Sequence, residues 1–467
     1  MDEGNDYLLS DKEYVAIFER CELMLESKIE TYFDVYEFTE LLDNYIDQGK
    51  LNKAYSLVNI AQKQHPGNIE LEFRKARIHI ERNDYDTAID ILKNLLRIED
   101  SNEEYHTCIG VAYAYTHDYT NAIKHFDAGI ALNPDTEEDN LYNIGVTFLH
   151  VDNYALAYDY LNKAHVKYPH NILVIYDLAY CCERLKQLDK SIELYKIYLD
   201  KDPYSEYAWF NMGLVYAQKE EFHDAIHAFD YAITINSKFS SAYFNRANCF
   251  MALDLYLDAR EAYKELLTLE PDNELAMVCI ADCSEKIGEF EESYMYYEKA
   301  TEIAPDFEEG WYGLALLEFY NNNTAKAIQL FEKAIELSDS NDKFWVSYGI
   351  ALSDDEQFPK AIAAFKKAIS LNAYEYEAWI QYSNIEYLLN NTNVAKRIVK
   401  KGIDKAPHAA LFFTLAAYYA NEQDMTNALE YFTKGVSLDA EFATMYFFDM
   451  CHIPLNSLQL FYDILLK

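Results

Sequence analysis

The chain has 467 residues, of which 51% are hydrophobic and 15% aromatic, so it is too long for one compact core and too apolar to be wholly disordered. Lysine and arginine number 40 against 79 aspartates and glutamates, giving a formal net charge of -39. Because binding to nucleic acid and to anionic membrane surfaces depends on cationic side chains, this charge argues against both as partners.

The amino terminus predicts neither export nor membrane insertion. The first 15 residues lack a basic segment followed by an apolar one, and nowhere are there 18 consecutive apolar residues. The eight cysteines contain no CxxC pair of the metal-binding type, which suits a reducing compartment. We therefore expect a soluble, cytoplasmic protein.

Residues 1–34 are predicted to form a tail followed by one helix. Apolar residues recur at helical spacing at Tyr14, Phe18, Cys21 and Leu25. This segment lies one period before the second helix of the first repeat described below. We interpret it as a degenerate half-repeat that caps the array, because an end repeat would otherwise expose its stacking face.

A repeat of about 34 residues organises residues 35–440. A small residue recurs in the pattern aromatic, x, x, Ala, x, x, x, apolar, at steps of 34 with one step of 35 and one of 33. We number the positions of each repeat as slots and place this anchor at slot 20. The twelve anchors are Ala54, Ala88, Ala122, Ala157, Ser191, Ala225, Ala259, Ser293, Ala327, Ala361, Ala395 and Ala428.

Other slots repeat in the same register. Slot 8 is small in every repeat except the first, which carries Leu42, and slot 4 holds every tryptophan of the chain. Slots 17 and 24 are mostly aromatic, and slot 32 is often proline, which ends one repeat and starts the next. The pattern predicts two helices per repeat, whose backbones approach closely at slots 8 and 20.

These slots resemble those of the tetratricopeptide repeat family, and the resemblance is densest in the sixth repeat, WFNMGLVYAQKEEFHDAIHAFDYAITIN. It implies an all-α fold, an α-solenoid in which helix-turn-helix repeats form a right-handed superhelix. It also implies that the first helix of each pair lines a concave wall, and that the protein holds other proteins.

Residues 441–467 are rich in apolar side chains, and Pro454 is expected to divide them into two short helices. One interpretation is that they pack on the twelfth repeat as capping helices. The alternative is an exposed patch for dimerisation or docking.

The sequence offers no site for catalysis. No GxxxxGK[ST], GxGxxG, HExxH or GxSxG motif occurs, and we expect neither enzymatic activity nor a cofactor. His223 and His227 lie four residues apart but off the buried stripe, which favours a solvated helix face over a metal site. Cys181, Cys249 and Cys283 share slot 10 and are interpreted as small core residues.

Polar amides recur at slot 6, on the expected inner wall. Asn143, Asn211 and Asn245 occupy it in repeats four, six and seven, with Asp177 in repeat five. The row resembles the asparagine ladders of O-linked N-acetylglucosamine transferases and of bacterial peptide sensors, which implies side-chain amides that bind the backbone of an extended peptide. A carboxamide can pair with both peptide N–H and C=O whatever the peptide sequence. The alternative is that these asparagines are simply solvated.

The neighbouring wall slots carry side chains suited to a binding surface. They are Tyr142, Tyr176, Tyr180, Tyr207, Phe210, Phe244 and Asn248. Aromatic residues that face a groove can select partner side chains, and the surrounding acidity favours a basic or apolar segment. We therefore predict a non-catalytic scaffold that binds an extended peptide in its concave groove. The alternative is an architectural subunit that self-associates, as a homodimer, or docks through the apolar carboxy-terminal segment.

Overall fold

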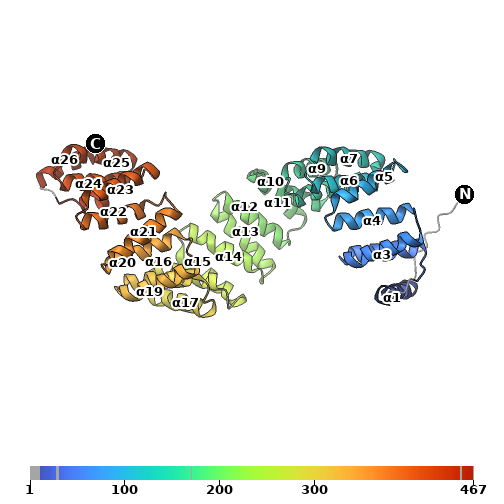
Figure 1. The fold of residues 1–467 in the computed structure, drawn as a ribbon, viewed down its shortest axis with the longest axis horizontal. Coiled ribbons are helices and arrows are strands. Elements are labelled where there is room, and N and C mark those ends of the chain that lie inside the picture. Colours follow the sequence, from blue (N-terminus) through green and yellow to red (C-terminus); the bar gives the residue numbers. More distant parts are fainter. Residues whose placement is uncertain (1–10, 28–30, 170, 453–454, 466–467) are drawn as a thin grey trace. The chain divides into compact units, whose positions relative to one another are not determined.

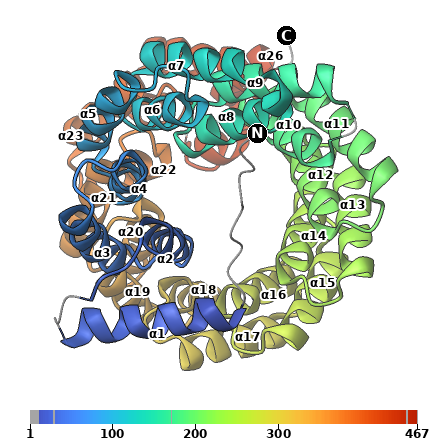
Figure 2. The same ribbon diagram turned by 90° about the vertical axis from the view of Figure 1, so that its right-hand side faces the viewer.

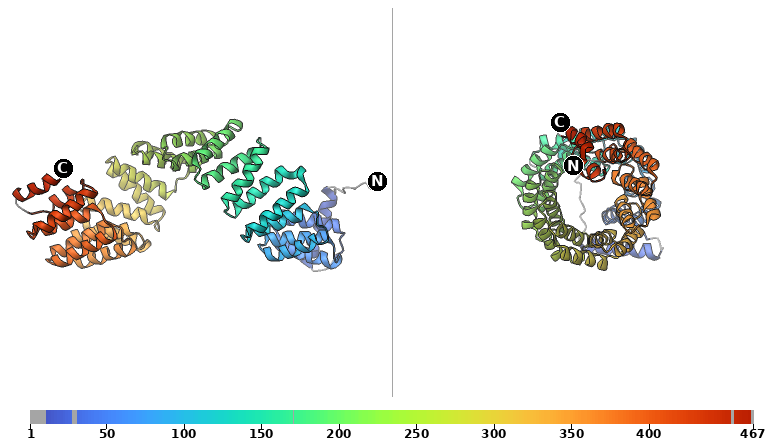
Figure 3. Two further views of the ribbon diagram at one scale, coloured as in Figure 1. Left: turned by 90° about the horizontal axis from the view of Figure 1, so that it is seen from above. Right: turned by 90° about the vertical axis from the view of Figure 1, so that its left-hand side faces the viewer.

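The computed structural model describes residues 11–27, 31–169, 171–452 and 455–465. It consists of two compact units, residues 1–220 and 221–467, here called the N-terminal unit and the C-terminal unit. Each is a stack of antiparallel helix pairs that follow one another in chain order (Figures 1 and 3). The part of the chain so described contains helices and no strand, as the predicted all-α solenoid requires.

The N-terminal unit begins with α1 (Asp11–Ser27). The first helices of its repeats are α2 (Val35–Asp47), α4 (Ile69–Glu81), α6 (Glu103–Tyr115), α8 (Glu137–His150), α10 (Ile172–Arg184) and α12 (Glu206–Gln218). The second helices are α3 (Leu51–Gln64), α5 (Tyr85–Leu96), α7 (Tyr119–Leu132), α9 (Tyr154–Lys167) and α11 (Leu188–Lys201). A short 3-10 turn, η1 (Pro134–Thr136), precedes α8 and takes up the extra residue of the 35-residue step.

The C-terminal unit continues the alternation. Its first helices are α14 (Ser240–Ala252), α16 (Glu274–Lys286), α18 (Glu308–Tyr320), α20 (Asp342–Asp354), α22 (Tyr376–Leu388) and α24 (Ala409–Asn421). Its second helices are α13 (Phe222–Ile235), α15 (Tyr256–Leu269), α17 (Phe290–Ile303), α19 (Thr324–Leu337), α21 (Phe358–Leu371), α23 (Thr392–Lys405) and α25 (Met425–Leu438). A π-helical turn, η2 (Thr444–Phe448), and α26 (Leu455–Leu465) follow.

The close approach of the two helices in a repeat depends on slot 8. In α6 a Cβ on Gly110 would lie 2.5 Å from the ring of Phe126, which occupies slot 24 of the same repeat. In α8 a Cβ on Gly145 would lie 2.6 Å from Leu161 Cγ, again at slot 24. The small residue is therefore needed because a large side chain from the second helix fills its place.

The turn inside each repeat has one feature that the slot pattern did not predict. Slot 15 has positive φ in all twelve repeats, although only Gly49 and Gly288 are glycines there. The others are Asn83, His117, Asp152, Lys186, Glu220, Asp254, Asn322, Glu356, Asn390 and Gln423. A side chain in this left-handed conformation is strained, so ten turns are held in place by the packing of the helices they join.

The two ends of the array carry additional helices. Cys21 and Met24 of α1 are buried in the core that α2 and α3 form, whereas the side chain of Tyr14 and the tail of residues 1–10 lie outside the described residues. At the other end Phe447 and Phe461 are fully buried beside Phe432 of the twelfth repeat. Pro454, the expected break between the two final helices, lies outside the described residues.

Candidate functional site

The first helices of neighbouring repeats lie side by side and form one wall in each unit. In the C-terminal unit α14, α16 and α18 line the inner side of the curve, and α15 and α17 lie outside them (Figure 2). In the N-terminal unit α4, α6, α8 and α10 are neighbours in the same way. The residues at slots 2, 5, 6, 9, 12 and 13 of these helices are called wall residues below.

Tyrosines at slot 5 bond to the slot 6 residue of the next repeat. The amide Nδ2 of Asn211 donates to the hydroxyl of Tyr176 at 2.7 Å. In the C-terminal unit the hydroxyls of Tyr312 and Ser347 are 3.0 Å apart. Both pairs join residues 35 positions apart, and they tie consecutive first helices together.

A third tyrosine follows the same rule with a charged partner. The hydroxyl of Tyr142 hydrogen-bonds to the carboxylate of Asp177, which stands where the other repeats of the row carry asparagine. Burial raises the pKa of Asp177 above its usual range, although the Tyr142 hydrogen bond and His150 oppose the shift. Burial and the neighbouring carboxylate also raise the pKa of Tyr142 to about 12.

The other two asparagines of the row have different surroundings. Asn143 is exposed and its side chain forms no hydrogen bond with the described residues, whereas Asn245 donates from Nδ2 to the carbonyl of Ser241 in its own helix at 2.8 Å. The repeats before them carry Thr107 and Phe210 at slot 5, so neither follows a tyrosine. Asn143 and Asn211 belong to the N-terminal unit and Asn245 to the C-terminal unit.

The remaining predicted wall residues are partly engaged in packing. The Tyr180 ring contacts that of Tyr154 edge-on at 6.2 Å, and Phe244 contacts Tyr263 at 5.7 Å. Asn248 is exposed and accepts a hydrogen bond from the Tyr263 hydroxyl at 2.5 Å. Phe210 is half-buried, whereas Tyr207 is 59% exposed.

Slot 6 is not polar in every repeat, and Gly313 shows why. A Cβ at this position would overlap the ring of Tyr297, which comes from the second helix of the preceding repeat. The glycine is thus required by packing.

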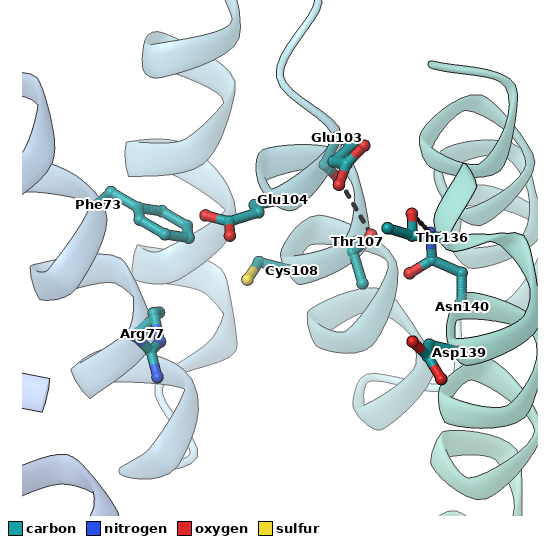
Figure 4. Close-up of a pocket in the computed structure, with 9 residues that line it drawn as sticks. All are labelled: Phe73, Arg77, Glu103, Glu104, Thr107, Cys108, Thr136, Asp139 and Asn140. Atoms are coloured by element: carbon teal, nitrogen blue, oxygen red, sulfur yellow. Dashed lines mark hydrogen bonds between the residues drawn. The ribbon is translucent and has the colours of Figure 1, made fainter. Parts of the chain in front are cut away.

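The wall is hollowed by cavities. One of about 430 Å³ lies in the N-terminal unit, where Phe73 and Arg77 of α4, Glu104 and Cys108 of α6 and Asp139 of α8 surround it (Figure 4). A second, of about 370 Å³, is lined by Phe244 and Asn245 in the C-terminal unit, and a third, of about 430 Å³, lies between α16, α18 and α20.

Sequence reasoning placed the site in repeats four to seven because it followed the asparagines. The first cavity lies in repeats two to four and the third in repeats seven to ten, and most of the residues that line them occupy wall slots. The repeat register defines the wall slots in every repeat. The acidic and aromatic residues at these slots in the other repeats could therefore have indicated both cavities from the sequence.

The cysteine and histidine interpretations can be checked directly. Cys181, Cys249 and Cys283 are buried, and burial raises the pKa of each thiol, which confirms them as core residues. His223 and His227 are both exposed on α13. Within the described ranges no group of three or more His, Cys, Asp and Glu is placed to hold a metal ion, and no helix there is long and apolar enough to cross a membrane.

Comparison with known families decides the identity of the repeat. Three sequence profiles described as tetratricopeptide repeat match the chain, at residues 45–109, at residues 210–274 and 312–377, and at residues 277–307 and 409–442. The chain belongs to the tetratricopeptide repeat family. A search of curated proteins gave no match.

Solved tetratricopeptide repeat structures resemble the chain at low identity. Yeast Tom70 is 13% identical, with a TM-score of 0.42, over 88% of this chain and 97% of its own. A tetratricopeptide repeat protein from Parabacteroides merdae is 18% identical, with a TM-score of 0.43, over 54% of this chain and 99% of its own. YrrB, described as having an unusual peptide-binding site, is 21% identical, with a TM-score of 0.33, over 40% of this chain and 97% of its own.

Proposed function

We propose that this tetratricopeptide repeat protein is a non-catalytic scaffold that binds an extended segment of a partner protein along its wall of first helices. Proteins of this family generally mediate protein–protein interactions. The observation that carries the proposal is the wall itself, which combines cavities of about 370 to 430 Å³ with half-buried aromatic rings and side-chain amides. Such a surface accommodates side chains while its polar groups pair with a backbone.

The three asparagines would contribute differently. The side-chain amide of Asn143 has both its N–H donors and its carbonyl acceptor available, because it is exposed and forms no hydrogen bond with a described residue. Asn211 already donates to Tyr176, so its carbonyl oxygen is the group that would accept from a peptide N–H. Asn245 would exchange its bond to Ser241 for one to the peptide.

The aromatic wall residues and the charge would select the partner. Tyr207 is 59% exposed, and exposed aromatic residues contribute strongly to protein interfaces. With a net charge of -39, the protein favours basic or apolar segments over acidic ones.

The test is a pull-down read by mass spectrometry that compares the wild type with Asn143→Ala, with the triple variant Asn143→Ala, Asn211→Ala and Asn245→Ala, and with Tyr176→Phe. Tyr176→Phe removes the internal hydrogen bond that Asn211→Ala also loses but keeps the amide and the aromatic ring, so it controls for the loss of that bond alone. At about 0.5 to 1.5 kcal/mol per lost hydrogen bond, the triple variant should bind roughly tenfold to a thousandfold more weakly. An unchanged set of captured proteins from the folded triple variant refutes the asparagine contacts.

A second candidate function is that of an architectural subunit that works by self-association or docking through residues 441–467. It is favoured by the exposure of apolar side chains there, with Met445 62%, Leu460 49% and Tyr462 44% exposed. Light scattering tests self-association, because a monomeric mass at micromolar concentration would refute it. A dimer that Leu460→Ser dissociates supports it.

A further inference from the structure

The groove between α16, α18 and α20 in the C-terminal unit has a chemistry of its own. It has a volume of about 430 Å³ and is lined mainly by wall residues of repeats eight, nine and ten, with a contribution from Met251 of repeat seven. Three of these residues are carboxylates, Asp282, Glu285 and Glu309, and all three are half-buried. Removing a carboxylate from water is costly unless it gains a partner.

The partners of these carboxylates are few. Asp282 accepts a hydrogen bond from the hydroxyl of Tyr297. Glu309 has a buried oxygen, Oε2, with no hydrogen-bond partner. None of the three forms an ion pair within the described residues. Burial accordingly raises the pKa of each of them above its usual range.

Structural acids in the same unit behave differently. Glu318 pairs with Lys326 at 2.6 Å, and Glu292 pairs with Lys264 at 3.0 Å and with Arg260 at 2.7 Å. These ion pairs lower the pKa of both glutamates, although burial opposes the shift. Glu318 and Glu292 are thus neutralised by direct ion pairs, whereas none of the three carboxylates in the groove forms one with a described residue.

Two lysines do line the groove, but they are exposed. Neither Lys286 nor Lys343 forms an ion pair with a described residue. Burial raises the pKa of Asp282 and Glu285 although the charge of Lys286 opposes the shift, so an incoming cation would meet carboxylates that no direct ion pair neutralises.

The apolar part of the groove suits the stem of a long side chain. The rings of Tyr312 and Phe344 are stacked with centroids 4.5 Å apart, and Leu316 lies beside them in the lining. Lysine and arginine bury their methylene stems against such surfaces, and a guanidinium or ammonium group is attracted to an aromatic face.

We propose that the groove between α16, α18 and α20 binds a basic side chain, arginine or lysine, of the extended partner segment. The inference rests on the proposed function, since it assigns one residue of that segment to one place on the wall. Glu309 and Glu285 would pair with the cation, and Tyr312 and Leu316 would hold its stem.

The test uses degenerate libraries of blocked dodecapeptides with arginine, lysine, citrulline or glutamate fixed at the sixth position. The full-length chain is immobilised, and the retained peptide is measured at physiological salt. Citrulline has the shape of arginine without its charge. The wild type should retain the arginine and lysine libraries about tenfold to a hundredfold better than the citrulline library, because hydrogen bonds to charged groups exceed neutral ones.

Non-specific attraction to an acidic protein is excluded by paired variants. Glu285→Gln with Glu309→Gln should reduce the preference for arginine over citrulline to about twofold. Glu298→Gln with Glu302→Gln changes the charge equally at exposed positions of α17 and should leave the preference intact.

As the pH falls, the preference for arginine over citrulline should begin to weaken at a higher pH than ordinary glutamates would give. Burial raises the pKa of both Glu285 and Glu309. At Glu285 the neighbouring Asp282 adds to the shift and Lys286 opposes it. At Glu309 the neighbouring Glu308 adds to the shift.

Three results overturn the inference. Equal retention of the arginine and citrulline libraries by the wild type refutes it while leaving the proposed function standing. Equal effects of the two paired variants mean that the attraction is non-specific. Failure of the wild type to retain any library refutes the inference together with the peptide-binding function.

Discussion

The hydrogen bond between Tyr176 and Asn211 makes a quantitative prediction about how first helices are held together. Tyr176→Phe removes the hydroxyl and changes helix propensity little, so it should destabilise the N-terminal unit by about 0.5 to 1.5 kcal/mol. Asn211→Ala loses the same bond but gains about 0.5 kcal/mol because alanine is the better helix former. Its net cost should therefore be about 0 to 1 kcal/mol.

A double-mutant cycle isolates the bond from the propensity change, since the latter cancels. We expect a coupling energy of about 0.5 to 1.5 kcal/mol, from urea unfolding followed by circular dichroism and from native-state hydrogen exchange of α10 and α12. Exchange is the more informative measurement, because arrays of repeats need not unfold in one step.

Two further cycles serve as controls. Tyr312→Phe with Ser347→Ala should show coupling of similar size, because the two hydroxyls are 3.0 Å apart. Tyr176→Phe with Asn143→Ala should be additive, since Asn143 forms no side-chain hydrogen bond within the described residues. A coupling below about 0.3 kcal/mol between Tyr176 and Asn211 would refute the structural role and leave Asn211 to its proposed contact with a peptide.

Three other outcomes are expected. Glu356→Gly should stabilise the C-terminal unit by about 0.5 to 1 kcal/mol in urea unfolding, because it relieves a φ of +58°, whereas Gly288→Ala, at +83°, should destabilise it. Asp177→Asn should stabilise the N-terminal unit at pH 7, because burial raises the folded pKa of Asp177 above its ordinary 3.8. The difference in stability between the wild type and Asp177→Asn should shrink as the pH falls from the raised pKa towards 3.8, and a difference that grows over this range would contradict the raised pKa of Asp177. Phe461→Ala should cost about 3 to 5 kcal/mol and speed hydrogen exchange in α25 and α26, since the ring is fully buried beside Phe432 of α25; unchanged exchange would show that α26 does not stabilise the last repeat.

The period of the sequence predicted most of the fold. Every first helix begins at slot 1 except α8, which begins one residue earlier, directly after η1. The family slots predict these limits because small residues at slots 8 and 20 allow only one close pairing of the two helices. Gly110 against Phe126 shows this directly.

The details of the wall could not be predicted in the same way. Asn211 is one of a row of amides in the sequence, but its bond to Tyr176 depends on the distance between neighbouring repeats, which spacing alone does not give. The left-handed turn at slot 15 could not be predicted either. Residues such as Glu220 and Glu356 disfavour positive φ, and only the packing of the two helices forces them into it. Burial of Asp282 and Glu309 likewise depends on how neighbouring repeats pack, which the spacing does not give.

The ties between consecutive first helices bear on how the chain is made. Each hydrogen bond between slot 5 and slot 6 of the next repeat spans 35 residues, and even the bond between Tyr446 and Glu377 at the carboxy-terminal end spans only 69. A repeat leaving the ribosome therefore finds its packing partner among the residues synthesised immediately before it. Such a chain can acquire its structure progressively during translation, and a nascent fragment of several complete repeats should already hold all but its last repeat in the native fold.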